Sequence, residues 1–321
     1  MKKLTDVVSE CRILVTGGAG FIGSWLCENL LSLGAEVTCL DNLSSGKLEN
    51  IKHLIDYKNF RFLKEDIVHF KPRGFDCIIH AASLPSPEDY MKRPVEAMLP
   101  NSVGLLNCLE ACRKEDSMML YTSTSEVYGD AEIIPTPEDY WGRVNPIGLR
   151  SCYDEAKRFG EALCMAYFRE YDVDVRIARI FNCYGPRIDV ESNYARVIPR
   201  FITQALKNEP ITVHGDGKQT RSFTYITDTI DALIKMIATN NTKGEVVNIG
   251  SEEEISIIEL AKLIIKLTSS SSKIVFTQAR PDDPRRRRPD ISKAKRLLAW
   301  EPRIKLQDGL RYTIEWFRRR S

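Results

Sequence analysis

Residues 13–23 read ILVTGGAGFIG, and they are the strongest indication of the fold in this sequence. Glycines stand at positions 17, 20 and 23, directly after an apolar run and before the amphipathic segment 24–34, SWLCENLLSLG. A strand, a glycine-rich turn and a helix in this order are typical of a dinucleotide-binding βαβ unit. Gly17 would allow the tight turn, Gly20 would let backbone N–H groups approach a pyrophosphate, and Gly23 would permit close helix packing.

Asp41 predicts which dinucleotide is bound, because it ends the next apolar run, 24 residues after Gly17. A carboxylate there accepts both ribose hydroxyls and repels a 2′-phosphate, so NAD is favoured over NADP. The alternative is an ordinary turn aspartate. Asp66 either meets the adenine, together with Ile67, or only caps the end of its strand. The predicted cofactor-binding residues are Gly17, Gly20, Phe21, Ile22, Gly23, Asp41, Asn42, Asp66, Ile67, Ala81, Tyr153 and Lys157.

The chain around this motif alternates short apolar runs with helical stretches up to about residue 180. The later apolar runs cover residues 35–42, 59–66, 77–83, 118–124 and 173–182. This alternation predicts an α/β Rossmann fold, a doubly wound parallel sheet with helices on both faces. After about residue 185 the alternation weakens. We therefore expect an NAD-binding domain over residues 1–180, a returning segment near 219–248, and a smaller substrate-binding lobe formed mainly by 181–321.

The composition is that of an ordinary globular protein, with 46 basic and 44 acidic residues and 43% hydrophobic residues. Nothing in this balance requires nucleic acid or a membrane surface as a partner, and no apolar run approaches the ~20 residues of a membrane span. A cytoplasmic protein is expected. The cysteines show no metal-ligand spacing, which predicts reduced core thiols and no metal site. They are Cys11, Cys27, Cys39, Cys77, Cys108, Cys112, Cys152, Cys164 and Cys183.

Tyr153 and Lys157 are the first candidate catalytic pair, four residues apart in the predicted helix around SCYDEAKRFGEAL. At this spacing both side chains project from one helix face. The ammonium, helped by a cationic nicotinamide ring, would lower the tyrosine pKa, so that the phenol can take a proton from a substrate hydroxyl. Such a pair alone also occurs by chance. Its position after TSTSE (122–126) favours the catalytic interpretation, with Thr124 in the same proton network.

Several motifs follow one another in a familiar order: TGGAGFIG, the strand-end Asp41, HAA at 80–82, TSTSE, YxxxK, FNCYGPR at 181–187 and RRPD at 287–290. From about residue 11 to its C-terminus the chain resembles the extended short-chain dehydrogenases/reductases of the NAD-dependent nucleotide-sugar epimerase/dehydratase family. The resemblance implies a nucleoside diphosphate sugar as substrate, with Asn182 and Arg287 at the diphosphate and Arg221 near the sugar.

The same resemblance implies a homodimer, with the Tyr153 helix and the helix near residues 101–114 as the contact. From the residues alone, the run RPDDPRRRRPD is either a solvated surface or an anion site.

The pair Ser125–Glu126 separates the members of this family. The 4,6-dehydratases carry adjacent acids, Asp-Glu, here, and the 4-epimerases usually carry no acid. A hydroxyl followed by a glutamate resembles the UDP-glucuronate decarboxylases. Residues 82–94 and 138–158 are similar to that group too, including Arg150, whereas the loop 188–201 around Arg196 departs from it.

The resemblance thus implies decarboxylation of UDP-glucuronate to UDP-xylose through a 4-keto intermediate, with bound NAD recycled. Glu126 would order a proton network near C5; the alternative is a buried structural acid that caps a loop. The expected catalytic residues are Thr124, Ser125, Glu126, Tyr153 and Lys157, and the expected substrate-binding residues are Ser86, Arg150, Asn182, Arg187, Arg196, Arg221 and Arg287. Three other functions stay open: a UDP-sugar or UDP-uronate 4-epimerase, a nucleotide-sugar 4,6-dehydratase, and an NAD-binding sensor without activity.

Overall fold

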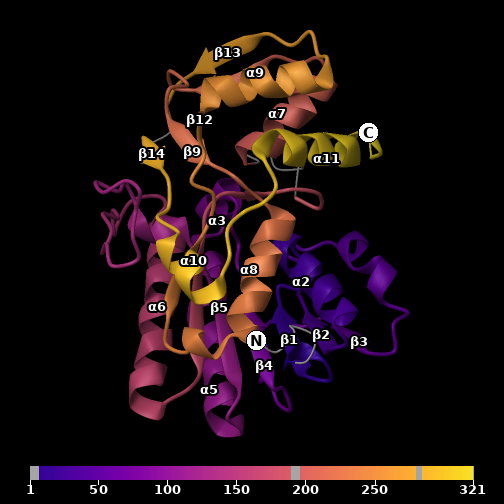
Figure 1. The fold of residues 1–321 in the computed structure, drawn as a ribbon, viewed down its shortest axis with the longest axis vertical. Helices are drawn as coiled ribbons and strands as arrows, with labels where there is room; N and C mark the ends of the chain where they lie inside the picture. The colour runs from indigo at the N-terminus through magenta and orange to yellow at the C-terminus, as the bar shows by residue number, and fades with distance from the viewer. Residues whose placement is uncertain (1–6, 189–195, 280–283, 321) are drawn as a thin grey trace.

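The computed structural model describes residues 7–188, 196–279 and 284–320. Within these residues, seven parallel strands form the central sheet, in the order β11-β6-β5-β4-β1-β2-β3 (Figure 1). The strands are β1 (Arg12–Thr16), β2 (Glu36–Leu40), β3 (Phe60–Leu63), β4 (Cys77–His80), β5 (Met118–Thr124), β6 (Val175–Ile180) and β11 (Val246–Ile249). The predicted Rossmann architecture is confirmed.

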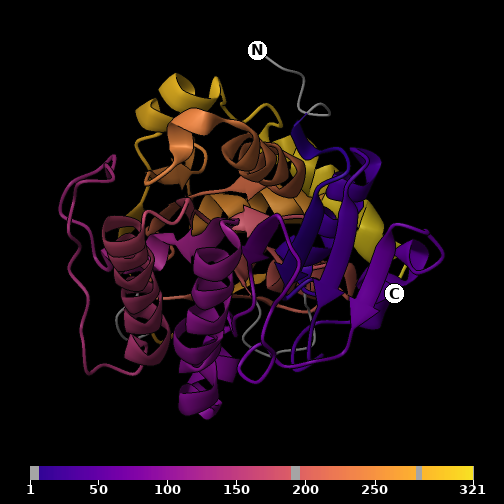
Figure 2. The same cartoon turned by 90° about the horizontal axis from the view of Figure 1, so that it is seen from below.

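Helices cover both faces of the sheet, because its strands are apolar on both sides. In β1, Ile13 and Val15 belong to one buried cluster and Leu14 belongs to the other. Helices α2 (Phe21–Ser32) and α8 (Ile226–Ala238) contribute to the first cluster. Helices α5 (Leu105–Glu115) and α6 (Ser151–Tyr171) contribute to the second and lie side by side (Figures 1 and 2). The two faces of the sheet therefore have separate cores.

The second part of the structure lies above the carboxyl ends of the strands in Figure 1. It contains the sheet β12-β9-β14, the parallel pair β8-β13 and three helices. Their bounds are β8 (Ile211–His214), β9 (Thr220–Ser222), β12 (Glu254–Ser256), β13 (Ile274–Thr277), β14 (Arg286–Arg287), α7 (Val197–Leu206), α9 (Ile257–Thr268) and α11 (Leu306–Arg318). Ser256 and Glu259 form a capping box that starts α9.

The chain crosses between the two parts more than once. Within the expected returning segment 219–248, α8 and β11 lie on the main sheet, whereas β9 pairs with β12 and β14. Helix α10 (Ser292–Leu298) lies near β11, and the short parallel pair β7 (Cys183–Tyr184) with β10 (Thr224–Tyr225) lies between the parts. The division into two domains stays our proposal.

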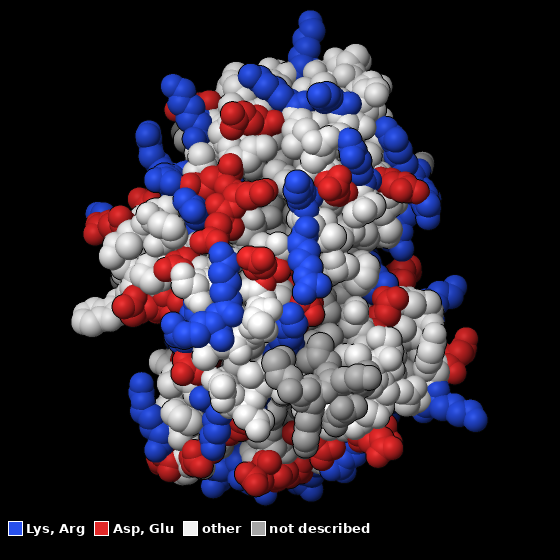
Figure 3. All heavy atoms as spheres, in the orientation of Figure 1, with Lys and Arg blue, Asp and Glu red and all other residues white. Residues whose placement is uncertain are grey.

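Short helices fill the connections. They are η1 (Leu48–Asn50), η2 (Lys52–Leu54), α3 (Pro87–Lys92), α4 (Pro94–Met98), η3 (Pro100–Gly104), η4 (Ser125–Tyr128) and η5 (Asn240–Thr242). No helix in the described part of the chain is long and apolar enough to cross a membrane. Basic and acidic side chains alternate over the described residues on the face shown in Figure 3, without the continuous basic stripe of a nucleic-acid-binding surface.

Candidate active site

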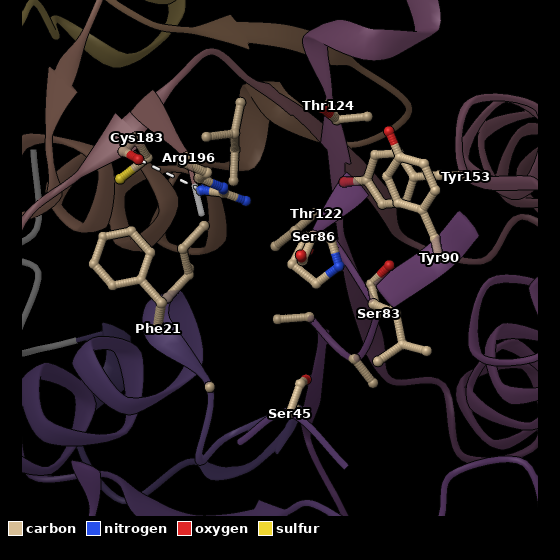
Figure 4. A pocket seen from close by; sticks show the side chains of 18 of the residues that line it. Phe21, Ser45, Ser83, Ser86, Tyr90, Thr122, Thr124, Tyr153, Cys183 and Arg196 are labelled. Atoms are coloured by element: carbon tan, nitrogen blue, oxygen red, sulfur yellow. Dashed lines mark hydrogen bonds between the residues drawn. The ribbon is translucent and has the colours of Figure 1, made fainter. Parts of the chain in front are cut away.

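The loops that follow the carboxyl ends of the parallel strands surround a cavity of about 570 Å³, where such folds bind their ligands (Figure 4). Every residue that the sequence analysis assigned to the cofactor, the substrate or catalysis lines this cavity. The shared cavity brings these side chains together. What each of them does there stays a proposal.

The glycine loop forms a cradle that side chains would fill. Gly17 has a φ of +67°, and a Cβ built on it would lie 2.8 Å from the backbone of Ala82. A Cβ on Gly23 would lie 2.1 Å from the carbonyl oxygen of Gly17. Helix α2 then begins at Phe21 with no acid in its first turn, so its N-terminal N–H groups favour an anion. The cradle therefore fits the pyrophosphate of a dinucleotide.

Asp41 lies at the end of β2, where its buried carboxylate also organises the glycine loop. Its oxygens accept hydrogen bonds from the N–H groups of Ala19, at 3.0 Å, and Leu43, at 2.8 Å. Burial raises the pKa of Asp41, and these two hydrogen bonds lower it. Asp66 accepts from Asn42 and from the N–H of Val68, each at 2.9 Å. Asp66 thus has the geometry of a cap, in addition to lining the cavity.

Tyr153 lies in the first turn of α6, with its ring stacked on that of Tyr90 at a centroid distance of 5.3 Å (Figure 4). Burial raises the pKa of Tyr153 to about 12, against lowering by Arg196 and by a hydrogen bond with Thr124. The Lys157 ammonium donates to the carbonyl of Thr122 at 2.8 Å, and burial lowers its pKa to about 7. Arg196 thus supplies a positive charge that favours the phenolate, and the expected influence of Lys157 on the Tyr153 pKa stays a prediction.

Glu126 lies in η4, immediately after β5, and its carboxylate joins two arginines. One oxygen accepts from Arg150 and the other from Arg287, as ion pairs. The side chains of Glu126 and Arg287 are 18% and 6% exposed. Burial raises the Glu126 pKa, but the two guanidinium groups outweigh it and hold the pKa well below its usual range. Glu126 is thus an ionised, largely buried carboxylate.

Arg287, which the resemblance implies at the diphosphate, pairs with Glu126 in this structure. Besides Glu126, it donates to the carbonyl of Gly129 at 3.3 Å. The strand β14 explains why this arginine turns inward: Arg286, one residue earlier, faces outward and pairs with Glu254, and Arg285 is exposed. No sequence pattern distinguishes these arginines, because a strand of two residues is too short to show an alternation.

The other predicted substrate contacts are spread over the cavity. Asn182 donates to the carbonyl of Ser222 at 2.9 Å, and Arg196 donates to that of Cys183 at 3.5 Å (Figure 4). Arg221 is 7% exposed, and the Ser86 hydroxyl is buried without a hydrogen-bond partner. Residues 189–195, in the loop noted as a departure, lie outside the described residues.

Arg187 is held on the cofactor side of the cavity. Its guanidinium pairs with Glu28 and lies 4.4 Å from the ring centroid of Trp25, and both of these residues belong to α2. This arginine therefore links the segment after β7 to the helix behind the glycine loop.

The sequence analysis missed Asp154, which lies beside the Glu126 cluster. It is 6% exposed, one carboxylate oxygen is buried without a hydrogen-bond partner, and the other lies 3.7 Å from Nε of Arg150. Burial, and then the charge of Glu126, raise the pKa of Asp154 to about 7. The i,i+4 spacing from Arg150 was the signal that would have found it.

Comparisons with known proteins agree with this geometry. The model of the NAD dependent epimerase/dehydratase family matches residues 13–250. The chain belongs to this family. Its cofactor is NAD, and the glycine cradle and Asp41 are the residues that fit it. No group of three or more His, Cys, Asp or Glu side chains that could hold a metal ion occurs within the described ranges.

The similar proteins include decarboxylases and epimerases. UDP-glucuronic acid decarboxylase 1 of Xenopus tropicalis is 46% identical over 308 residues, which cover 96% of this chain and 72% of that protein. UDP-glucuronic acid decarboxylase 3 of Arabidopsis thaliana is 46% identical over 96% of this chain and 90% of that protein. The crystal structure of UDP-glucuronic acid 4-epimerase from Bacillus cereus, in complex with UDP-glucuronic acid and NAD, is 32% identical with a TM-score of 0.89, over 97% and 100% of the two chains.

The Asp41 carboxylate generates the first prediction. We expect the purified protein to release NAD rather than NADP on denaturation, and Asp41→Ala to carry much less nucleotide, because both the ribose acceptor and the loop contact are lost. Chromatography of the released nucleotide measures both. Asp56→Ala, at an exposed acid, is the matched control. Recovery of mainly NADP from the wild type would contradict this account.

The Asp154 pKa generates a prediction on stability. Because the pKa of Asp154 in the folded protein lies above its ordinary value, the native state binds the proton more tightly than the unfolded state. The protonated carboxyl therefore adds to the free energy of unfolding at low pH, and this stabilisation is lost as the pH rises toward about 7. Asp154→Asn should therefore gain stability relative to the wild type between pH 4.5 and 7.5. Urea unfolding of both proteins at several pH values measures the difference, and a difference that does not change with pH would refute the shift.

Proposed function

We propose that this chain decarboxylates UDP-glucuronate to UDP-xylose, with bound NAD recycled in each turnover. The observation that carries the proposal is the ionised Glu126, held between Arg150 and Arg287 in the cavity that also contains Tyr153. The relatives named UDP-glucuronic acid decarboxylase, at 44–47% identity over nearly the whole chain, support the same reaction.

Tyr153 and Thr124 handle the proton on the C4 hydroxyl. The phenolate takes this proton while the C4 hydrogen leaves as hydride, and Thr124 shares the hydrogen bond. Bound NAD, held by the glycine cradle and Asp41, would supply the hydride acceptor for C4 and, once reduced, the hydride donor. Lys157, fixed on the Thr122 carbonyl, holds the ribose and keeps a positive charge near the site when it is protonated.

Loss of CO2 requires no acid in this site. Once C4 is a ketone, the C6 carboxylate is a β-keto acid: the C5–C6 bond breaks, CO2 leaves, and the electron pair forms an enolate with the C4 oxygen. A proton from water then reaches C5. Because two arginines hold Glu126 ionised, we assign it to ordering the water rather than to donating the proton. Ser125 occupies the position where dehydratases carry the first acid of their pair.

The arginines provide the charge that a uronate requires. While Asp154 is protonated, Arg150 and Arg287 together carry one more charge than Glu126, and Arg221 is near enough to lower the Glu126 pKa as well. This surplus attracts the C6 carboxylate, as charge-assisted hydrogen bonds to guanidinium do. We therefore place Arg287 at the uronate carboxylate rather than at the diphosphate. The residues that we expect to bind the diphosphate and the nucleotide are Ser86, Asn182, Arg187, Arg196 and Arg221.

The alternative function is a UDP-sugar or UDP-uronate 4-epimerase. It is favoured by the 0.89 TM-score to an epimerase whose crystal structure holds UDP-glucuronic acid. The same oxidation at C4 begins both reactions, and they differ in whether the carboxylate leaves. A nucleotide-sugar 4,6-dehydratase is less favoured because position 125 lacks an acid.

A cytoplasmic homodimer completes the proposal. All nine cysteines are free thiols, which suits a reducing compartment. The exposed apolar side chains Val103, Leu106 and Phe159 lie on η3, α5 and α6, the helices expected to pair with a second copy.

Leu106→Asp with Phe159→Asp should shift the mass measured by light scattering from a dimer to a monomer, whereas Ile55→Asp, an exposed control, should not. A monomeric mass for the wild-type protein would exclude the homodimer.

Proton NMR of the reaction with UDP-glucuronate in D2O tests the function. We expect UDP-xylose, or its 4-keto precursor, with deuterium at C5. Glu126→Gln should slow turnover strongly and Ser125→Ala less, while Tyr153→Phe should nearly abolish oxidation and still bind the substrate. Glu132→Gln is the matched control, because Glu132 pairs with Arg143 at the surface. UDP-galacturonate with its carboxylate intact would establish the epimerase instead.

A further inference from the structure

Asn248, in the returning strand β11, is fully buried and lies outside the cavity wall. Its side-chain oxygen accepts from the hydroxyl of Tyr128 at 2.8 Å. Its amide nitrogen donates to the carbonyl of Thr136 at 2.9 Å and to that of Asp290 at 3.1 Å. Both amide hydrogens and the oxygen are thus used, which only an Asn-shaped group at this position can do.

The three partners of Asn248 belong to the three segments that carry the charged cluster. Tyr128 lies two residues after Glu126 in η4. Thr136 lies in the connection that ends at Arg150, and Asp290 lies three residues after Arg287. One side chain therefore joins the segments that bear the carboxylate and both of its guanidinium partners.

Further hydrogen bonds make this junction rigid. The N–H of Thr136 donates to the carbonyl of Arg288 at 2.9 Å, and the N–H of Asp290 donates to the carbonyl of Thr136 at 3.0 Å. The N–H of Asn248 donates to the Glu138 carboxylate at 2.8 Å. The Thr136 segment is thereby fixed both to the segment that carries Arg287 and to the central sheet.

Arg179 adds a fourth element to the junction. It donates to the hydroxyl of Tyr128 at 2.7 Å and to the carbonyl of Glu138 at 2.8 Å, and it also pairs with Glu161 of the helix that carries Tyr153. The network thus connects the helix of the proton-transferring tyrosine to the three segments of the charged cluster.

We propose that Asn248 is a positioning residue that sets the two guanidinium groups on Glu126 and thereby gives the site its preference for a sugar with a C6 carboxylate. This inference rests on the function proposed above. If the junction is released, the segments around residues 136 and 290 can separate, and each arginine can leave Glu126 without any change in the cofactor cradle. Asn248 acts through the backbone of its neighbours and does not contact the substrate.

Asn248→Asp is the sharpest test, because it keeps the shape and the acceptor for Tyr128 but removes both donors to the carbonyls. We expect NAD content and the affinity for UDP to stay at wild-type levels, and kcat/KM for UDP-glucuronate to fall by about tenfold or more, equivalent to about 1.4 kcal/mol. The acidic limb of the kcat/KM profile should move to higher pH, because the pKa of Glu126 rises when the arginines withdraw.

Two further variants separate positioning from simple destabilisation. The buried Thr242, shortly before β11, donates a hydrogen bond to the carbonyl of Met236. Thr242→Val removes this bond and should lower the melting temperature without shifting the pH profile of kcat/KM. Tyr128→Phe, which loses one contact of Asn248, should repeat the effect of Asn248→Asp more weakly, and serves if that variant does not fold. If Asn248→Asp had the kcat/KM and the pH profile of the wild type, the proposal would be overturned. The same result in Tyr128→Phe would overturn it if only that variant folds. A parallel loss of NAD and UDP binding would also overturn it.

The outcome for the wild type keeps the two proposals distinct. If the wild type does not decarboxylate UDP-glucuronate, the proposed function fails. The role of Asn248 is then measured by binding, as the ratio of the dissociation constants of UDP-glucuronate and UDP in the variant and in the wild type. An unchanged ratio in Asn248→Asp would overturn the positioning role on its own.

Discussion

A largely buried carboxylate between two guanidinium groups is the constraint on which the site depends. Removing such charges from water costs several kcal/mol per ion, so they persist only where they are paired with good geometry. Glu126 meets this condition through Arg150 and Arg287, which are 24 and 161 residues away in the chain. Removing either partner would leave a buried charge poorly compensated, so the surrounding structure has to hold both.

The fold meets this requirement at the edge where the parallel strands end. β5 brings Thr124, Ser125 and Glu126 to this edge, and the connection to α6 brings Arg150 and Tyr153. The second part of the structure contributes β14 with Arg287, paired to β9 beside Arg221. The cofactor cradle, the tyrosine and the charged cluster are thus supplied by separate elements.

Local patterns in the sequence predicted the parts of this site that depend on short-range spacing. The glycine turn, the strand-end Asp41 and the Tyr153–Lys157 pair are each set by one strand, turn or helix, and all of them line one cavity. The partner of Arg287 and the junction at Asn248 depend on contacts between distant segments. No single-sequence pattern encodes such contacts, and in the arginine run only the pairing of β14 with β9 decides which guanidinium turns inward.

In the mechanism we propose, the arginines on Glu126 recognise a uronate. Titration calorimetry of NAD-loaded Tyr153→Phe protein with UDP-glucuronate and with UDP-glucose tests this recognition, because the two ligands differ only at C6. We expect tighter binding of UDP-glucuronate, loss of that preference when Arg287→Gln is added, and no loss with Arg285→Gln at the exposed neighbour. Equal affinity for the two ligands, or equal effects of the two arginine substitutions, would contradict it.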